Sequence, residues 1–163
     1  MKKIVKWLDE YLEEVLLAAA LTAMAVIMGV QVFCRYVLSA SLSWSEELTR
    51  YIFIWAGFLS VSYCTKKCIS IKIEQFVALF PKRGRAVFKV VNHTFELILF
   101  LYLIPFAWKY LMSAVANGQT SPAMGIPMYF VQAAPLVGFI LAAIRVLQRW
   151  VIEFRTASGK GGE

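Results

Sequence analysis

The chain has 163 residues, of which 60% are hydrophobic and only 17% are charged. A soluble domain of this length exposes much of its surface and needs more charge to stay in solution. The net charge of +7 could suggest a nucleic-acid partner, but the basic residues lie in short segments between long apolar runs, as in membrane proteins. The composition therefore predicts an all-α integral membrane protein, surrounded by phospholipid, with no nucleic-acid partner.

The N-terminal region is predicted to contain an interfacial helix followed by the first membrane span. Within residues 3–14, apolar side chains recur at helical spacing opposite a charged face, which is typical of an amphipathic helix lying along the interface. The first span is predicted at residues 15–38, because residues 15–34 carry no charge and cover roughly the 30 Å hydrocarbon core. Acidic residues between the N-terminal lysines and this run favour an uncleaved anchor over a signal peptide.

A polar stretch rich in charge, residues 35–51, separates the first apolar run from the next. After Arg50, only residues 51–65 are free of charge, and their helix would be about 22 Å long, which is too short to span. The second span is therefore predicted at residues 44–65, starting near Trp44. Ser43 and Glu46 have the spacing of a capping box that would open this helix.

The charges of this stretch fall at the predicted membrane edge, where unpaired charges are unfavourable. Glu46 and Arg50 share one helix face in the favourable acid-first order. We expect Arg35, Glu46, Glu47 and Arg50 to form a paired cluster that joins the first two spans. The alternative is a solvated cluster that only sets the depth of the helix, and its outer members could also contact a soluble partner.

The second half of the chain is predicted to hold two further spans, at residues 87–109 and 127–150. A basic segment precedes them, and residues 69–80 within it are predicted to form a surface-lying amphipathic helix. Residues rich in glycine and proline between the two spans indicate a loop. Basic residues gather at both termini and in residues 66–89, so the positive-inside rule places these segments in the cytoplasm and the two other loops outside.

Among the polar residues within the predicted spans, His93, Glu96 and Arg145 are the candidates for an intramembrane role. His93 and Glu96 could form a proton relay, or they could pair with each other, with Arg145 or with a partner subunit. A haem held by two histidines of this chain is excluded, since His93 is its one histidine. No phosphate-binding loop, nucleophile with a base, or cluster of metal-binding carboxylates is present, so we expect no enzymatic activity and no cofactor.

Two motifs carry a resemblance to a known family. The first comprises Arg35-Tyr36, the run Ser41-Leu42-Ser43-Trp44-Ser45-Glu46-Glu47, Arg50-Tyr51 and Trp55; the second is Ser121-Pro122-Ala123-Met124-Gly125-Ile126-Pro127, followed by Pro135 and Gly138. At these positions the chain resembles the small, DctQ-like membrane subunit of tripartite ATP-independent periplasmic (TRAP) transporters. The resemblance extends over about residues 8–152.

This resemblance implies a four-span subunit of the bacterial inner membrane that works in a three-part secondary transporter. In such a transporter, a periplasmic binding protein captures an organic acid, and a large multi-span subunit carries the transport and sodium sites and moves like an elevator. The small subunit would scaffold the large one and help to dock the binding protein. Arg35, Trp44, Glu46, Glu47, Arg50, Tyr51 and Trp55 are then the expected interface residues.

Two other functions stay open on the sequence alone. The chain could be a small proton-coupled exporter that uses Glu96, or it could be the membrane anchor of a redox enzyme with His93 as a haem ligand. Uptake or efflux by the chain alone would favour the first, and a Soret band in the purified protein would favour the second.

Overall fold

Four long helices contain most of the residues that the computed structural model describes, which are 2–40, 42–67 and 82–157. The helices are α1 (Lys2–Val37), α2 (Ser43–Lys67), α4 (Lys82–Asn117) and α5 (Tyr129–Ala157). The prediction of an all-α chain is therefore confirmed. The surface-lying helix predicted for residues 69–80 lies outside the described residues.

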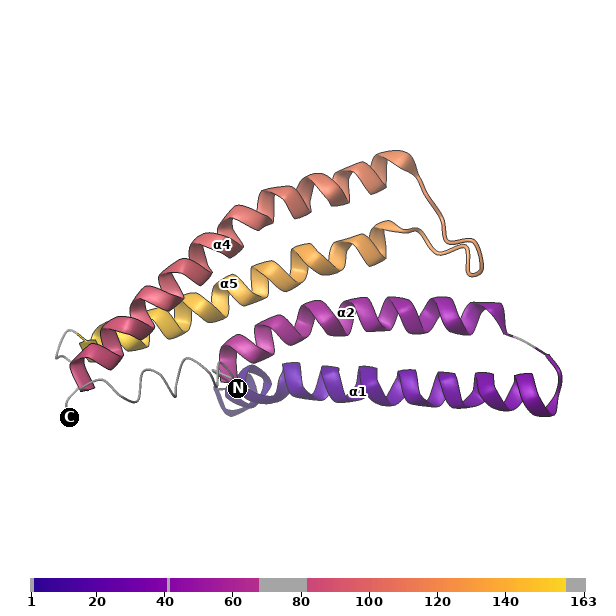
Figure 1. Cartoon of the computed structure of the whole chain (residues 1–163), viewed down its shortest axis with the longest axis horizontal. Helices are drawn as coiled ribbons and strands as arrows, with labels where there is room; N and C mark the ends of the chain where they lie inside the picture. Colours follow the sequence, from indigo (N-terminus) through magenta and orange to yellow (C-terminus); the bar gives the residue numbers. More distant parts are fainter. Residues whose placement is uncertain (1, 41, 68–81, 158–163) are drawn as a thin grey trace.

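The helices lie side by side in a single layer in the order α1, α2, α5, α4 (Figure 1). Extensive packing joins only neighbours in this order: α1 with α2, α2 with α5, and α5 with α4. A closed four-helix bundle would instead surround a shared core. Because the layer is open, large apolar side chains stay exposed along its outermost helices, among them Leu21 and Val26 of α1 and Phe95 and Tyr102 of α4.

Each outermost helix attaches to the layer through one narrow stripe of side chains. On α1, the buried and half-buried side chains recur at alternating steps of four and three residues. They are Glu13, Leu17, Ala20, Met24, Ile27, Gln31 and Cys34, with Ala23 beside them. On α4, the same spacing recurs at His93, Leu97, Phe100, Ile104, Ala107, Leu111 and Ala114. This is the spacing by which one helix packs along a single neighbour, as in a coiled coil.

The two inner helices approach each other closely at Gly138 of α5. A Cβ atom at this position would lie 2.7 Å from Cβ and 2.8 Å from the carbonyl oxygen of Phe58 on α2. Close approach of helix backbones at a small residue is a common basis of helix association in membranes. The core lies next to this contact and joins Phe100 of α4 to Ala142, Ala143 and Val146 of α5.

Among the described helices, three are long and apolar enough to cross a membrane, over Tyr11–Val37, Phe88–Asn117 and Tyr129–Phe154. They correspond to the predicted spans 15–38, 87–109 and 127–150. Helix α2 forms where the span 44–65 is predicted, but it is less apolar than the other three, so the four-span count stays a prediction. Both loops lie at one end of the layer, and the described ends of α1 and α5 lie at the other (Figure 1).

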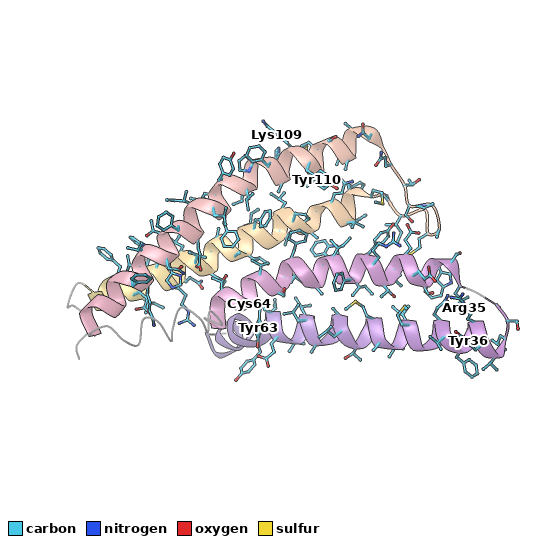
Figure 2. All side chains as sticks on the ribbon, in the orientation of Figure 1. Arg35, Tyr36, Tyr63, Cys64, Lys109 and Tyr110 are labelled. Atoms are coloured by element: carbon cyan, nitrogen blue, oxygen red, sulfur yellow. The ribbon has the colours of Figure 1, made fainter. Side chains whose placement is uncertain are left out.

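Two predicted boundaries fall inside continuous helices. The span predicted to end at residue 109 ends within α4, which continues through Lys109 and Tyr110 to Asn117 (Figure 2). A single lysine within a strongly helical sequence does not end a helix, whereas Gly118, with a left-handed φ of 57°, does. At the N-terminus, the amphipathic helix predicted at 3–14 is continuous with the first span in α1, so no break separates them.

Candidate functional site

The loop end of the layer, where residues 38–42 connect α1 to α2 and residues 118–128 connect α4 to α5, contains both motifs of the sequence. The second loop is tightly folded. Thr120 and Pro127 form an antiparallel bridge, and the Ser121 nitrogen donates to the Ile126 oxygen at 2.8 Å. Gly125 has a φ of 66°, a conformation that glycine adopts without strain.

Glu47 of α2 binds this loop directly. Its Oε2 atom accepts hydrogen bonds from the backbone nitrogens of Ala123 at 2.9 Å and Met124 at 3.2 Å. Its Oε1 atom accepts a hydrogen bond from the hydroxyl of Tyr51, one turn further along α2. The Tyr51 oxygen also lies 3.5 Å from the sulfur of Met128. Glu47 and Tyr51 are both buried, so these contacts hold the loop against the start of α2.

A second buried contact joins the loop end of α1 to the start of α2. The Oε1 atom of Gln31 accepts a hydrogen bond from the Leu42 nitrogen at 3.1 Å, and the Ser45 hydroxyl lies 2.8 Å from the same atom. Sequence reasoning missed Gln31. The available signal was its polar side chain within the uncharged run 15–34, because a polar residue in an apolar helix needs a hydrogen-bond partner.

The predicted ion-paired cluster does not form. Glu47 binds backbone groups of the second loop, and no ion pair joins Arg35, Glu46, Glu47 and Arg50 within the described residues. Glu46 and Arg50, although one turn apart, are both exposed. Backbone N–H donors of a rigid loop satisfy a buried carboxylate without moving a long arginine side chain. This explains why Glu47 pairs with the loop.

The capping box predicted from Ser43 and Glu46 is also absent. Helix α2 already includes Ser43, and in the described residues the Ser43 side chain makes no hydrogen bond. Leu42 precedes the helix, its carbonyl oxygen lies 2.7 Å from the Ser45 hydroxyl, and its nitrogen is bound by Gln31. The start of α2 is therefore fixed by a side chain of α1, which local sequence patterns do not reveal.

Of the other predicted interface residues, all but Trp55 lie on the outside of the loop end. Arg35, at the end of α1, is exposed beside Tyr36, whose exposed fraction is 79% (Figure 2). Trp44 is also exposed, and Trp55 is half-buried within the layer. The loop end thus combines a buried hydrogen-bonded interior with an outer surface of exposed charged and aromatic side chains. Whether these residues form an interface stays a prediction.

At the opposite end, a buried ion pair ties α1 to α5. Oε1 of Glu13 accepts hydrogen bonds from Nε of Arg145 at 2.9 Å and from the Ser62 hydroxyl of α2 at 3.0 Å. Arg145 also donates to Gln148 at 3.0 Å. The sequence identified Arg145 as an intramembrane polar residue but did not identify Glu13 as its partner. In the structure, Glu13 lies at the start of the same packed series as Gln31.

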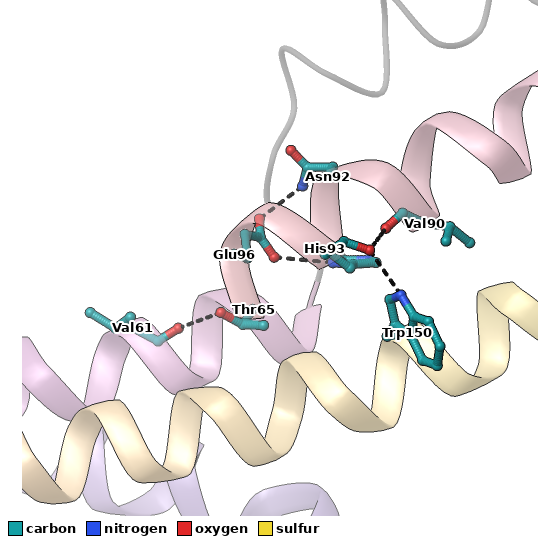
Figure 3. Close-up of polar contacts among 8 residues, drawn as sticks. Val61, Thr65, Val90, Asn92, His93, Glu96 and Trp150 are labelled. Atoms are coloured by element: carbon teal, nitrogen blue, oxygen red, sulfur yellow. Dashed lines mark hydrogen bonds and ion pairs between the residues drawn. The ribbon is translucent and has the colours of Figure 1, made fainter. Parts of the chain in front are cut away.

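His93 and Glu96 pair with each other on α4 (Figure 3). Nδ1 of His93 lies 3.0 Å from Oε2 of Glu96, and Oε1 of Glu96 accepts a hydrogen bond from Asn92 at 2.9 Å. This arrangement matches one of the sequence alternatives. In the part of the chain that the structure describes, no group of three or more His, Cys, Asp or Glu side chains could hold a metal ion.

The fold and the site together define a class of protein: an open layer of apolar helices that carries ordered polar contacts at both ends. Residues 24–156 match the family described as "Tripartite ATP-independent periplasmic transporters, DctQ component". The chain belongs to this family. It is therefore a transport subunit and not an enzyme, and it is a multi-pass protein of the bacterial inner membrane.

Curated relatives agree with this assignment. The chain is 29% identical to the isethionate TRAP transporter permease protein DctMQ of Oleidesulfovibrio alaskensis, over 89% of this chain and 24% of the relative. It is 24% identical to the ectoine TRAP transporter small permease protein TeaB of Halomonas elongata, over 83% of this chain and 70% of the relative.

A third relative is the sialic acid TRAP transporter permease protein SiaT of Haemophilus influenzae, which is 29% identical over 89% of this chain and 23% of the relative. The chain thus spans about a quarter of the length of DctMQ and SiaT and most of the length of TeaB.

Proposed function

We propose that this chain is the non-catalytic small subunit of a sodium-coupled, binding-protein-dependent secondary transporter that imports an organic acid. Its role is to scaffold a large transport subunit. The observation that carries the proposal is the single open layer of helices, in which the outermost helices pack along one narrow stripe each. The described helices leave both faces of this layer uncovered and enclose no path for a solute, and they offer a long surface to a second membrane subunit.

In this proposal α2 is the fourth span, and both termini lie in the cytoplasm. Two observations support it. Helix α2 has 25 residues, enough for about 37 Å of helix, and it lies between α1 and α5, which both qualify as spans. Its neighbours bury three of its polar side chains, Ser45, Glu47 and Ser62, so it can be less apolar than the others. The loop end then faces the periplasm.

The relatives support a large partner subunit. DctMQ and SiaT are named as permease proteins and are about four times longer than the part matched by this chain, whereas TeaB is named as a small permease protein. We infer that the counterpart of this chain is one part of a fused polypeptide in the first two. A separate large subunit, carrying the transport site and the sodium sites, would then complete the transporter here.

The exposed side chains at the loop end support a second partner, the periplasmic binding protein. Arg35, Glu46 and Arg50 present both signs of charge there without a partner in the described residues. Such side chains steer the approach of a soluble partner more than they hold it. The relatives are named for isethionate, ectoine and sialic acid, so the small subunit does not identify the substrate.

The test is reconstitution of the full transporter. The chain, a tagged large permease encoded beside it and the binding protein are expressed together, purified and placed in liposomes. We expect the chain to co-purify with the large permease, and uptake to require all three proteins and an inward sodium gradient. Failure of the chain to co-purify, or uptake that persists without it, would contradict the scaffold role.

The same preparation separates the alternatives. Transport by this chain alone that is abolished by Glu96→Gln would support the proton-coupled exporter, and a Soret band would support the redox anchor. Glu96 is engaged by Asn92 and His93 of its own helix, and His93 uses Nδ1 for this pair, so we expect neither result.

A further inference from the structure

The outermost face of α4 carries two polar groups that the described helices do not satisfy. Phe95, Tyr102 and Lys109 follow one another at steps of seven residues, so they share the side of α4 opposite the stripe that packs against α5. All three are exposed, and Lys109 lies on the outer side of α4 (Figure 2). Within the part of the chain that the structure describes, the Tyr102 hydroxyl and the Lys109 ammonium have no hydrogen bond or ion pair.

The depth of these two groups in the membrane follows from a contact between α4 and α5. Nε1 of Trp150 on α5 donates to the Thr94 hydroxyl of α4 at 3.0 Å, and tryptophan is typical of the interface between membrane and water. Counted from Thr94 at 1.5 Å per residue, Tyr102 lies about 12 Å along α4 and Lys109 about 22 Å. A hydrocarbon core about 30 Å thick therefore contains both, and Lys109 is still about 8 Å from its far edge.

The Lys109 side chain does not lean toward the water at that edge. In an α-helix, side chains lean toward the N-terminus, and α4 has its N-terminus at the end of the layer where Thr94 lies. The ammonium group is therefore directed back into the hydrocarbon core. A charge in the core is strongly unfavourable unless it is paired. A carboxylate beside Lys109 would supply the missing partner, and a hydrogen-bond acceptor would do the same for Tyr102.

The outermost face of α1 has no such requirement. Residues 15–34 carry no charge, and the exposed side chains among them include Leu21, Val26 and Phe33, which are compatible with hydrocarbon. A second copy of this chain does not fit the face of α4 either. A two-fold axis along the membrane normal would bring the two Lys109 ammonium groups together at the same depth, where like charges repel.

We propose that the large transport subunit docks on the outermost face of α4, where one of its carboxylates pairs with Lys109 and one of its polar groups accepts a hydrogen bond from Tyr102. The outermost face of α1 then contacts lipid. This inference rests on the proposed function and adds which of the two outer helices meets the partner. A charge pair at one depth also fixes the register of the two subunits across the membrane.

The experiment is photocross-linking of the complex between this chain and the tagged large permease in lipid bilayers. Phe106→benzoylphenylalanine places the probe beside Tyr102, since the two rings lie 5.0 Å apart, and Leu21→benzoylphenylalanine places it on the outermost face of α1. We expect the first probe to cross-link to the large permease and the second to lipid only. The proposal is overturned if the Phe106 probe links only to lipid or to a second copy of this chain, or if the Leu21 probe links to the large permease.

The charge of Lys109 provides a second measurement. Lys109→Glu should reduce the amount of co-purified large permease by about fivefold or more, whereas Lys109→Arg, which keeps the charge, should retain it. The melting temperature of the isolated subunit should stay the same in both variants, because Lys109 is exposed. Normal binding of the large permease by Lys109→Glu would exclude a carboxylate partner. A wild-type chain that fails to co-purify at all would contradict the proposed function itself, on which this inference rests.

Discussion

The carboxylate of Glu47 lies 2.9 Å from the backbone nitrogen of Ala123, although 76 residues separate them in sequence. Glu47 belongs to the first of the two motifs that carry the family resemblance, and Ala123 belongs to the second. The structure thus brings both motifs into one hydrogen-bonded unit at the loop end. A buried carboxylate that accepts backbone N–H groups is an effective way to fix a loop, because charge-assisted hydrogen bonds are stronger than neutral ones.

The first prediction concerns this contact. Glu47→Ala removes the acceptor for the Ala123 and Met124 nitrogens and leaves the Tyr51 hydroxyl without its acidic partner. We expect the free energy of unfolding of the isolated subunit to fall by roughly 1–3 kcal/mol, since buried donors lose their partner. Thermal unfolding in one detergent measures the change. The control is Glu46→Ala, which alters an exposed neighbour and should leave the melting temperature unchanged; equal losses in both variants would contradict the assignment.

The second prediction concerns the crossing of α2 and α5. In Gly138→Ala, the added Cβ meets backbone and Cβ atoms of Phe58 at 2.7–2.8 Å, so the two helices must move apart. We expect a loss of stability of about 1–3 kcal/mol, as for other overpacked contacts. Thermal unfolding in the same detergent measures it.

Gly57→Ala is the matched control for this variant. Gly57 also lies in a helix, but nothing lies within 4 Å of its Cβ position, so the added methyl group should be neutral or slightly stabilising. If Gly138→Ala were as stable as Gly57→Ala, the close approach of α2 and α5 would not hold.

Sequence patterns predicted the helices and missed their arrangement for a physical reason. Apolar length, the charged segments before α2 and α4, and the breaker-rich loop before α5 located all four described helices, since these are local properties of the chain. The pairing of Glu47 was missed because its partners are backbone nitrogens of a loop that is distant in sequence. The side chains of that loop give no indication that its backbone binds a carboxylate. The ion pair predicted from the nearby charges of Glu46 and Arg50 does not form. Exposed ion pairs contribute little to stability, and the entropy lost by the two side chains opposes them.

Gln31 and Glu13 show what a closer use of the sequence could have found. Both stand on the four-and-three series that packs α1 against α2, one near each end of it. A polar side chain in or beside an apolar span needs a partner on a facing helix, so these two residues predict buried polar contacts at both ends of α1. The partners are Ser45 for Gln31, and Ser62 with Arg145 for Glu13. Their identity depends on the order of the helices, which local sequence patterns do not contain.

The third prediction concerns the buried ion pair. Arg145→Met leaves the Glu13 carboxylate buried without its charge partner, and removal of one member of a buried pair typically costs about 3–5 kcal/mol of stability. The double variant Glu13→Gln with Arg145→Met should recover part of this loss, because no unpaired charge remains. Chemical and thermal unfolding of the three proteins measure the difference. If the double variant were less stable than Arg145→Met, the unpaired charge of Glu13 would not be the cause of the instability of Arg145→Met.

A more exposed ion pair provides the comparison for this cycle. Nζ of Lys89 on α4 lies 3.3 Å from Oε1 of Glu153 on α5, and the two side chains are 33% and 21% exposed. Water solvates part of this pair, so Lys89→Met should reduce stability by no more than about 1 kcal/mol. A loss as large as that of Arg145→Met would mean that burial does not set the strength of these pairs.

The fourth prediction separates folding from docking at the loop end. Arg35, Glu46 and Arg50 are exposed, and the structure gives them no partner among its described residues. If they meet the binding protein, charge reversal at Arg50 (Arg50→Glu) should leave the melting temperature and the co-purified large permease unchanged. It should slow uptake several-fold at low ionic strength, with the difference shrinking as salt screens the charges.

Glu47→Ala should instead lower the melting temperature together with uptake. Uptake in Arg50→Glu that equals the wild type at every salt concentration would exclude Arg50 from docking, and a loss of large permease in the purified complex would move its role to the subunit interface.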